Sequence, residues 1–408
     1  MYWIMLDEVV RKHALKNAFD YGKAQPGSVI AKVVAELPDC KADMKSTMAV
    51  VVKGVAEVNA LSRAQVESEV SGYSFPEKKQ RDWLPELEWA LGGAEVNTRI
   101  APNPSGYAHM GHAKQAILGD EYARKYGGKF WLRFEDTDPR TKKPVPEFYE
   151  LILEDLEWLG CKIYKVVKQS ERLLIYYDYC ERLMRAGKAY VCTCAKEEMQ
   201  KNRLEARACA CRGQSSSHAL LEWKKMLDGA YAEGGAVVRI KTEVDHPNSS
   251  IRDWVMLRIV DEAHPVTGKK YRVWPLYNFA AAIDDHEMDI TLVTRGKEHE
   301  LNAIKQGYAY AAFGWTQPHS IETGVLKIRG GLEHKSDIRD AIARGELSGW
   351  DDPRAPTLRG MKARGIDPRA IRDYIISCGV GKNDSYLDEA KLDSFNRKYV
   401  ERERNAVV

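Results

Sequence analysis

The segment from residue 98 to residue 134 constrains the fold of this chain more than any other part. A short apolar stretch at 98–101 leads through Pro- and Gly-rich turns to His109-Met110-Gly111-His112, where a helix is expected over 110–126. A Gly-Gly pair would end that helix, and residues 129–134 have the composition of a buried strand. Strand, helix and strand in this order predict a right-handed βαβ unit in a parallel sheet.

The two histidines mark the first candidate site. Ligands of such sheets bind beyond the carboxyl ends of the strands, and a helix N-terminus offers backbone N–H groups and partial positive charge. His109 and His112 add donors there, and Gly111 leaves room for a phosphate. The pattern suits a nucleoside triphosphate, although histidines at a helix start are also often caps. The chain has no G-x-G-x-x-G fingerprint, which argues against a dehydrogenase.

Residues 99–112, Arg-Ile-Ala-Pro-Asn-Pro-Ser-Gly-Tyr-Ala-His-Met-Gly-His, resemble the first ATP-binding motif of class I aminoacyl-tRNA synthetases, in the glutamyl/glutaminyl branch. Arg-Phe-Glu-Asp-Thr-Asp at 133–138, the Asp-Asp-His segment at 274–299 and Gly-Trp-Asp-Asp-Pro-Arg at 349–354 resemble further motifs of that branch, in the same order. On this likeness, which covers roughly residues 70–400, the chain is identified as a member of the archaeal-type glutamyl-tRNA synthetases.

The resemblance implies ATP as a substrate, with Mg²⁺ expected from the phosphate chemistry. It assigns ATP binding to His109, Gly111, His112, Lys335 and Ser336, with His109, His112 and Lys335 as the catalytic residues. Lys335-Ser336 is what this chain retains of the K-M-S-K-S loop, because Leu332, Glu333 and His334 replace its first three residues. One lysine is the minimum that charge stabilisation of the departing pyrophosphate requires, so a weakened or inactive variant stays an alternative.

The resemblance also implies a binding site for L-glutamate. It assigns this site to Arg99, Glu135, Tyr277 and Arg295, while Ala281 stands where bacterial members carry an asparagine contact. A carboxylate suits the α-ammonium group, and a guanidinium pairs with a carboxylate bidentately. Glutamate is favoured over glutamine, because the arginine and the E-D-T-D-P sequence differ from the usual glutaminyl pattern.

Four of the eight cysteines form two close pairs. Cys192-x-Cys194 and Cys209-x-Cys211 are separated by 14 residues, a spacing that suits tetrahedral Zn²⁺. The resemblance implies a structural role for this ion, in a small domain that meets the tRNA acceptor end. The remaining cysteines stand alone and are expected to be ordinary thiols.

Composition sets the broad class of the protein. The 408 residues carry a net charge of only +3, which neither demands nor excludes nucleic acid. No apolar run reaches the ~18 residues of a membrane helix, and the apolar N-terminal run is too short for a secretory signal. We therefore expect a cytoplasmic protein with no membrane partner.

The expected architecture is α/β, with a Rossmann-like parallel sheet as the catalytic domain. The boundaries are 1–95 for an N-terminal helical extension and linker, 96–189 for the first half of the catalytic domain, 190–265 for an inserted acceptor-binding domain with the zinc site, 266–345 for the second half with the degenerate loop, and 346–408 for a helical stem-contact segment. The sheet is expected to resume at 271–282 and 289–294.

The expected function is ATP-dependent ligation of L-glutamate to tRNA through glutamyl-adenylate, with release of AMP and pyrophosphate. Family members continue into anticodon-reading β-barrels beyond the last helix, so a chain ending at Val408 is expected to hold the acceptor end but discriminate anticodons poorly. The alternatives are a weakened paralogue or truncated form acting as a tRNA acceptor-binding subunit, and a tRNA-modifying glutamyl-transfer relative. A partner protein could bind through the N-terminal helices.

Overall fold

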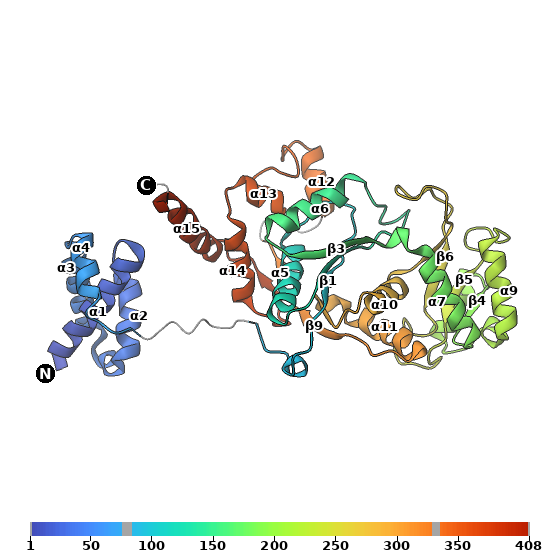
Figure 1. Ribbon diagram of the computed structural model, residues 1–408, viewed down its shortest axis with the longest axis horizontal. Coiled ribbons are helices and arrows are strands. Elements are labelled where there is room, and N and C mark those ends of the chain that lie inside the picture. The colour runs from blue at the N-terminus through green and yellow to red at the C-terminus, as the bar shows by residue number, and fades with distance from the viewer. Residues whose placement is uncertain (1, 76–83, 329–334, 407–408) are drawn as a thin grey trace. The chain divides into compact units, whose positions relative to one another are not determined.

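The computed structural model describes residues 2–75, 84–328 and 335–406. The chain forms two compact units, Met1–Arg81 and Asp82–Val408 (Figure 1), and each has a hydrophobic core of its own. Within the described ranges, no helix is long and apolar enough to cross a membrane.

The first unit is helical, as its apolar spacing predicts. Its helices are α1 (Tyr2–Tyr21), α2 (Pro26–Glu36), α3 (Met44–Asn59) and α4 (Arg63–Val70), with a short 3₁₀ turn at Pro38–Asp43. Val10, Leu15, Val51 and Val55 are buried in its core. Helices α1 and α3 approach closely at Gly54, because a Cβ there would lie 2.6 Å from Cγ1 of Val10.

Parallel strands form the centre of the second unit. β1 (Thr98–Ile100), β2 (Phe130–Phe134) and β3 (Ile163–Lys168) pair in that order, connected by α5 (Met110–Lys125) and α6 (Glu147–Trp158). β8 (Leu292–Gly296) pairs in parallel with β9 (His319–Thr323) across α11 (Glu300–Phe313). The carbonyl of Asn97 accepts hydrogen bonds from the amides of Thr291 and Leu292, which places β8 beside β1. The predicted parallel α/β architecture is confirmed.

An antiparallel sheet separates the two sets of parallel strands. It contains β4 (Ala189–Cys192), β5 (Val237–Ile240), β6 (Val255–Ile259) and β7 (Val273–Pro275), and α7 (Leu173–Arg185), α8 (Lys196–Leu204) and α9 (Ser216–Leu227) accompany it. We call β4 to β7 with α8 and α9 the insertion. It forms one end of the unit in Figure 1.

The expectation that the parallel sheet resumes at 271–282 is wrong. β7 pairs antiparallel with β6, and Tyr277 begins the helix α10 (Tyr277–Glu287). The apolar run from Phe279 to Ile283 is fully buried, and a continuous apolar run does not distinguish a buried helix from a buried strand. The parallel sheet resumes with β8, which overlaps the second expected segment, 289–294, at residues 292–294.

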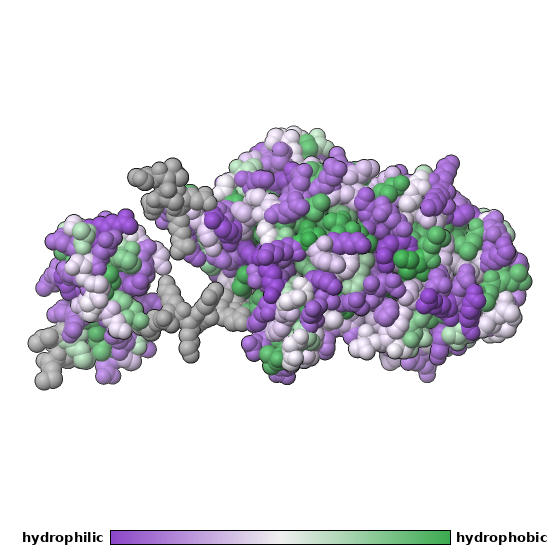
Figure 2. All heavy atoms as spheres, viewed as in Figure 1, coloured by the Kyte–Doolittle hydropathy of each residue, from purple (hydrophilic) through white to green (hydrophobic). Residues whose placement is uncertain are grey.

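The rest of the unit is mainly helical, as expected. It comprises α12 (Lys335–Ala343), α13 (Leu358–Ala363), α14 (Pro368–Cys378) and α15 (Glu389–Ala406), with β10 (Leu326–Lys327) paired in parallel to β11 (Ser385–Tyr386). Hydrophilic residues cover most of the visible face of this unit, and apolar residues gather near its middle (Figure 2).

Candidate active site

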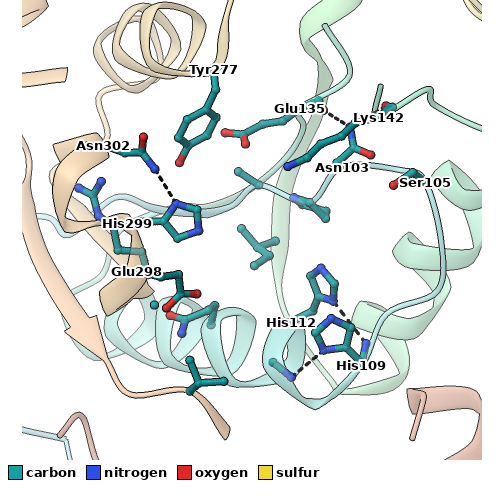
Figure 3. Close-up of a pocket in the computed structure, with 18 of the residues that line it drawn as sticks. Asn103, Ser105, His109, His112, Glu135, Lys142, Tyr277, Glu298, His299 and Asn302 are labelled. Carbon is teal, nitrogen blue, oxygen red and sulfur yellow. Dashed lines mark hydrogen bonds between the residues drawn. The ribbon is translucent and has the colours of Figure 1, made fainter. Parts of the chain in front are cut away.

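A cavity of about 1230 Å³ lies beyond the carboxyl ends of β1, β2 and β8. The predicted site residues that line it are Arg99, His109, Gly111, His112, Glu135, Tyr277 and Arg295. Figure 3 shows the two histidines on one side of this space and Tyr277 with Asn302 on the opposite side. Residues far apart in the sequence thus converge on one space, at the edge of the sheet where ligands of parallel α/β folds bind.

The two histidines lie at the start of α5. His109 is the N-cap, and its Nδ1 accepts a hydrogen bond from the amide of Gly111 at 3.1 Å. Nδ1 of His112 accepts from the amide of His109 at 3.4 Å, and the two ring centroids are 4.1 Å apart. A Cβ at Gly111 would lie 2.9 Å from Cε1 of His109. The histidines are caps, and they also stand at the positive end of the helix, inside the cavity.

Asp285 joins two arginines at the base of the cavity. Nε of Arg99 lies 3.1 Å from Oδ1 of Asp285, and Nη1 of Arg133 lies 2.6 Å from the same oxygen. Burial raises the pKa of Asp285, but the two guanidinium groups outweigh it and hold that pKa below its ordinary value. Asp285 is therefore an ionised carboxylate that fixes both arginines.

Glu135 lies next to this network, at the end of β2. Its Oε1 accepts a hydrogen bond from Nη2 of Arg133 at 3.2 Å. Burial raises the pKa of Glu135, against the opposing effects of Arg133 and Arg99. Figure 3 shows its carboxylate directed toward the middle of the cavity, between Tyr277 and Lys142. A buried carboxylate in this position is suited to a ligand with an ammonium group.

Arg295, on β8, is a buried arginine whose hydrogen-bond partners in the described part of the chain are both neutral. Its Nε donates to Oγ of Ser320 at 3.0 Å and its Nη1 to Oε1 of Gln306 at 3.2 Å. No carboxylate of the described residues forms an ion pair with it. Burial and the nearby Arg99 lower the pKa of Arg295. A buried guanidinium with neutral partners is a receptor for an anion.

Several cavity residues were not singled out from the sequence. His299 packs on Tyr277 with ring centroids 5.9 Å apart, and its Nδ1 lies 3.0 Å from Nδ2 of Asn302. Asn103 donates to the carbonyl of Glu135 at 2.7 Å. Asp285 and His299 lie within the segment 274–299 that resembles a family motif. The sequence alone assigned neither residue a function.

The Gly-Trp-Asp-Asp-Pro-Arg segment packs against the turn that precedes the histidines. Trp350 stacks on Tyr107 with centroids 5.2 Å apart, and the amide of Leu358 donates to the carbonyl of Ala108 at 3.0 Å. The Lys335-Ser336 pair begins α12, but its side chains and the whole of 332–334 lie outside the described residues.

The four paired cysteines come together in the insertion. Their Sγ atoms all lie within 4.8 Å of one another. The Sγ atoms of Cys192 and Cys209 are 3.8 Å apart, as are those of Cys194 and Cys211. Four sulfurs at ~2.3 Å from a tetrahedral zinc ion would be about 3.8 Å apart. The four sulfurs are therefore spaced as the ligands of one such cation would be.

Comparison with known proteins agrees with this geometry. Residues 95–402 match the family model described as tRNA synthetases class I (E and Q), catalytic domain. Glutamate–tRNA ligases from Thermococcus kodakarensis and Archaeoglobus fulgidus are 48% and 42% identical, over 97% and 98% of this chain and 70% and 73% of their own lengths. A crystal structure of a glutamate tRNA ligase from Elizabethkingia meningosepticum, in complex with its amino acid, aligns with a TM-score of 0.55 at 25% identity, over 76% of this chain and 70% of that one.

Proposed function

This chain belongs to the class I tRNA synthetases of the E and Q family, and from that premise we propose that it is a glutamate–tRNA ligase. ATP and L-glutamate form glutamyl-adenylate and pyrophosphate. The glutamyl group then passes to the terminal adenosine of tRNA and AMP leaves. Near-complete coverage of this chain by glutamate–tRNA ligases at 42–48% identity is the observation that carries the proposal. The same reaction assigns the protein to the cytoplasm, where tRNA is charged.

In this proposal glutamate lies between Glu135 and Arg295. The carboxylate of Glu135 binds the α-ammonium group, and the buried guanidinium of Arg295 binds a carboxylate, with Tyr277 beside both. Arg99 adds positive charge while Asp285 holds it in place. A neutral amide in place of the side-chain carboxylate would leave Arg295 without its anion, which is costly in a buried site. This difference favours glutamate over glutamine.

ATP binds with its phosphates at the N-terminus of α5. His109, Gly111 and His112 surround the α-phosphate, where negative charge develops as the adenylate forms. Lys335 stabilises the departing pyrophosphate together with Ser336. Mg²⁺ bound to the phosphates would neutralise part of their charge. The in-line attack by the glutamate carboxylate then needs only positioning and charge stabilisation.

The four cysteines of the insertion would hold a structural Zn²⁺ ion. Four sulfur ligands would leave no position for a reactive water. Such an ion would join the end of β4 to the 3₁₀ turn at Ala210–Gly213. The insertion would then form a rigid surface against which the tRNA acceptor end binds.

Aminoacylation with purified protein, ATP, L-glutamate and tRNA-Glu tests the proposal. We expect glutamyl-tRNA to form and glutamine to be used far less efficiently. Equal use of glutamine would overturn the choice of substrate. Binding of tRNA with no pyrophosphate exchange in its presence would instead support the acceptor-binding subunit, which the substitutions at Leu332, Glu333 and His334 favour.

A further inference from the structure

Two cations in the cavity have no role in the reaction described so far. Arg203, in the last turn of α8, and Lys305, in α11, both line the cavity. Arg203 belongs to the insertion, and Lys305 belongs to the helix that connects β8 to β9. Among the residues that the structure describes, no carboxylate forms an ion pair with either side chain.

Both side chains are partly buried, so the absence of an anionic partner in the described part of the chain is energetically unfavourable for each charge. Nε of Arg203 is buried and has no hydrogen-bond acceptor. Burial lowers the pKa of both groups, and the charge of Arg203 lowers that of Lys305 further. Two cations that are partly buried side by side repel each other unless an anion lies between them. The pair therefore has the properties of an anion site.

The position of the pair within the cavity indicates which anion it takes. Lys305 lies one helical turn beyond Asn302, and Figure 3 shows Asn302 on the side of the cavity opposite His109. The ATP phosphates, held at the start of α5, are thus at the other end. Arg203 belongs to the same helix that follows Cys194, in the wall assigned to the tRNA acceptor end.

We propose that Arg203 and Lys305 bind a backbone phosphate of the single-stranded CCA end of tRNA and so position the terminal ribose for glutamyl transfer. The inference rests on the proposed function, because only a tRNA substrate brings such a phosphate into this cavity. A cationic groove that follows the backbone is how proteins bind single strands without reading their sequence. The two residues are positioning residues and take no part in bond formation.

The test compares two RNAs on three proteins. Dissociation constants are measured for intact tRNA-Glu and for tRNA-Glu lacking its 3′ CCA, with wild type, Arg203→Gln/Lys305→Gln and Lys196→Gln/Lys201→Gln. The last variant removes two exposed lysines from α8 and matches the change in charge. Wild type should bind intact tRNA about tenfold more tightly than the shortened one. The Arg203/Lys305 variant should lose this preference, and the control should keep it.

Steady-state kinetics separates the two phosphate sources. In the Arg203/Lys305 variant the KM for tRNA should rise while the KM values for ATP and glutamate, at saturating tRNA, stay within about twofold. A preference for intact tRNA that persists in this variant would overturn the inference while charging by wild type upholds the ligase. A rise in the KM for ATP alone would assign the pair to the nucleotide and equally overturn it. Absence of charging by wild type would instead contradict the proposed function.

Discussion

Asp285 holds Arg99 through both oxygens, with Nε 3.1 Å from Oδ1 and Nη2 3.4 Å from Oδ2. The same carboxylate pairs with Arg133 at 2.6 Å, and all three side chains are buried. Asp285 is therefore the carboxylate that Arg99 and Arg133 share beneath the proposed glutamate site, and Arg133 also pairs with Glu135. This relationship explains why residues from β1, β2 and α10 keep a fixed arrangement.

Replacing Asp285 with Asn should lower the free energy of unfolding. The change leaves the buried Arg99 without its anion and removes one of the carboxylates that pair with Arg133. Loss of one partner of a buried ion pair costs about 3–5 kcal/mol. Urea unfolding of Asp285→Asn against wild type measures this loss. Asp289→Asn, at an exposed position in the turn that follows α10, is the control and should change the free energy of unfolding by less than about 0.5 kcal/mol.

Replacing Arg295 with Gln should weaken glutamate binding specifically. Removing the cation that faces a buried carboxylate costs about 2–5 kcal/mol, which predicts a rise in the KM for glutamate of about a hundredfold. The KM for tRNA should be unchanged, and Arg182→Gln, an exposed change on α7, should affect neither. An unaltered KM for glutamate would exclude Arg295 from the amino-acid site.

The purified protein should contain one zinc ion per molecule, bound at the four cysteines. Cys192→Ser should lower the zinc content and the melting temperature together, because the ion stabilises only the folded insertion. Metal analysis and calorimetry measure both quantities. Cys378→Ser removes an exposed thiol far from the group and should change neither. Full zinc content in the Cys192 variant would contradict the assignment.

Lys335 should be essential for adenylate formation. With the first lysine of the loop replaced by Leu332, no second lysine of the motif remains to stabilise pyrophosphate. Lys335→Ala should therefore reduce pyrophosphate exchange, measured with tRNA present, by about a hundredfold or more. Lys362→Ala, an exposed change on α13, should have no effect. Normal exchange in the Lys335 variant would refute a role for this residue.

His264 should make the protein less stable in mild acid. Its Nδ1 accepts from the amide of Val266 at 3.1 Å, so Nε2 carries the proton and donates to the carbonyl of Asp136 at 2.7 Å. Burial lowers the pKa of His264 below its ordinary value of 6.5. The unfolded chain then binds a proton that the folded chain resists, so the free energy of unfolding should fall as the pH drops from about 7 toward the lowered pKa.

Denaturant unfolding at pH 7 and pH 5.5 measures this effect of His264. His264→Gln should show a smaller loss of stability between the two values than wild type. His218→Gln, at an exposed position on α9, should behave as wild type. An identical pH dependence in all three proteins would contradict the assignment.

The sequence predicted the parts of the fold that depend on short-range patterns. The βαβ unit around α5 follows from strand, glycine and helix signals within 98–134, and the cysteine group follows from spacing. The role of Asp285 does not follow from any such signal, because Arg99 lies 186 residues away in the chain. The helix at α10 was misassigned because burial on every side removes the periodicity that would identify it.

The turn that follows β2 also connects the parallel sheet to the insertion. Beside the carboxylate of Glu135, this turn contacts the insertion three times: Asp136 through His264, Asp138 through Arg258, and Arg140 through Glu233 and Glu262. The turn that follows β2 thus carries Glu135 into the proposed glutamate site and also holds the insertion. We therefore expect a rotation of the insertion to shift Glu135 as well, so that the two parts of the cavity wall would move together.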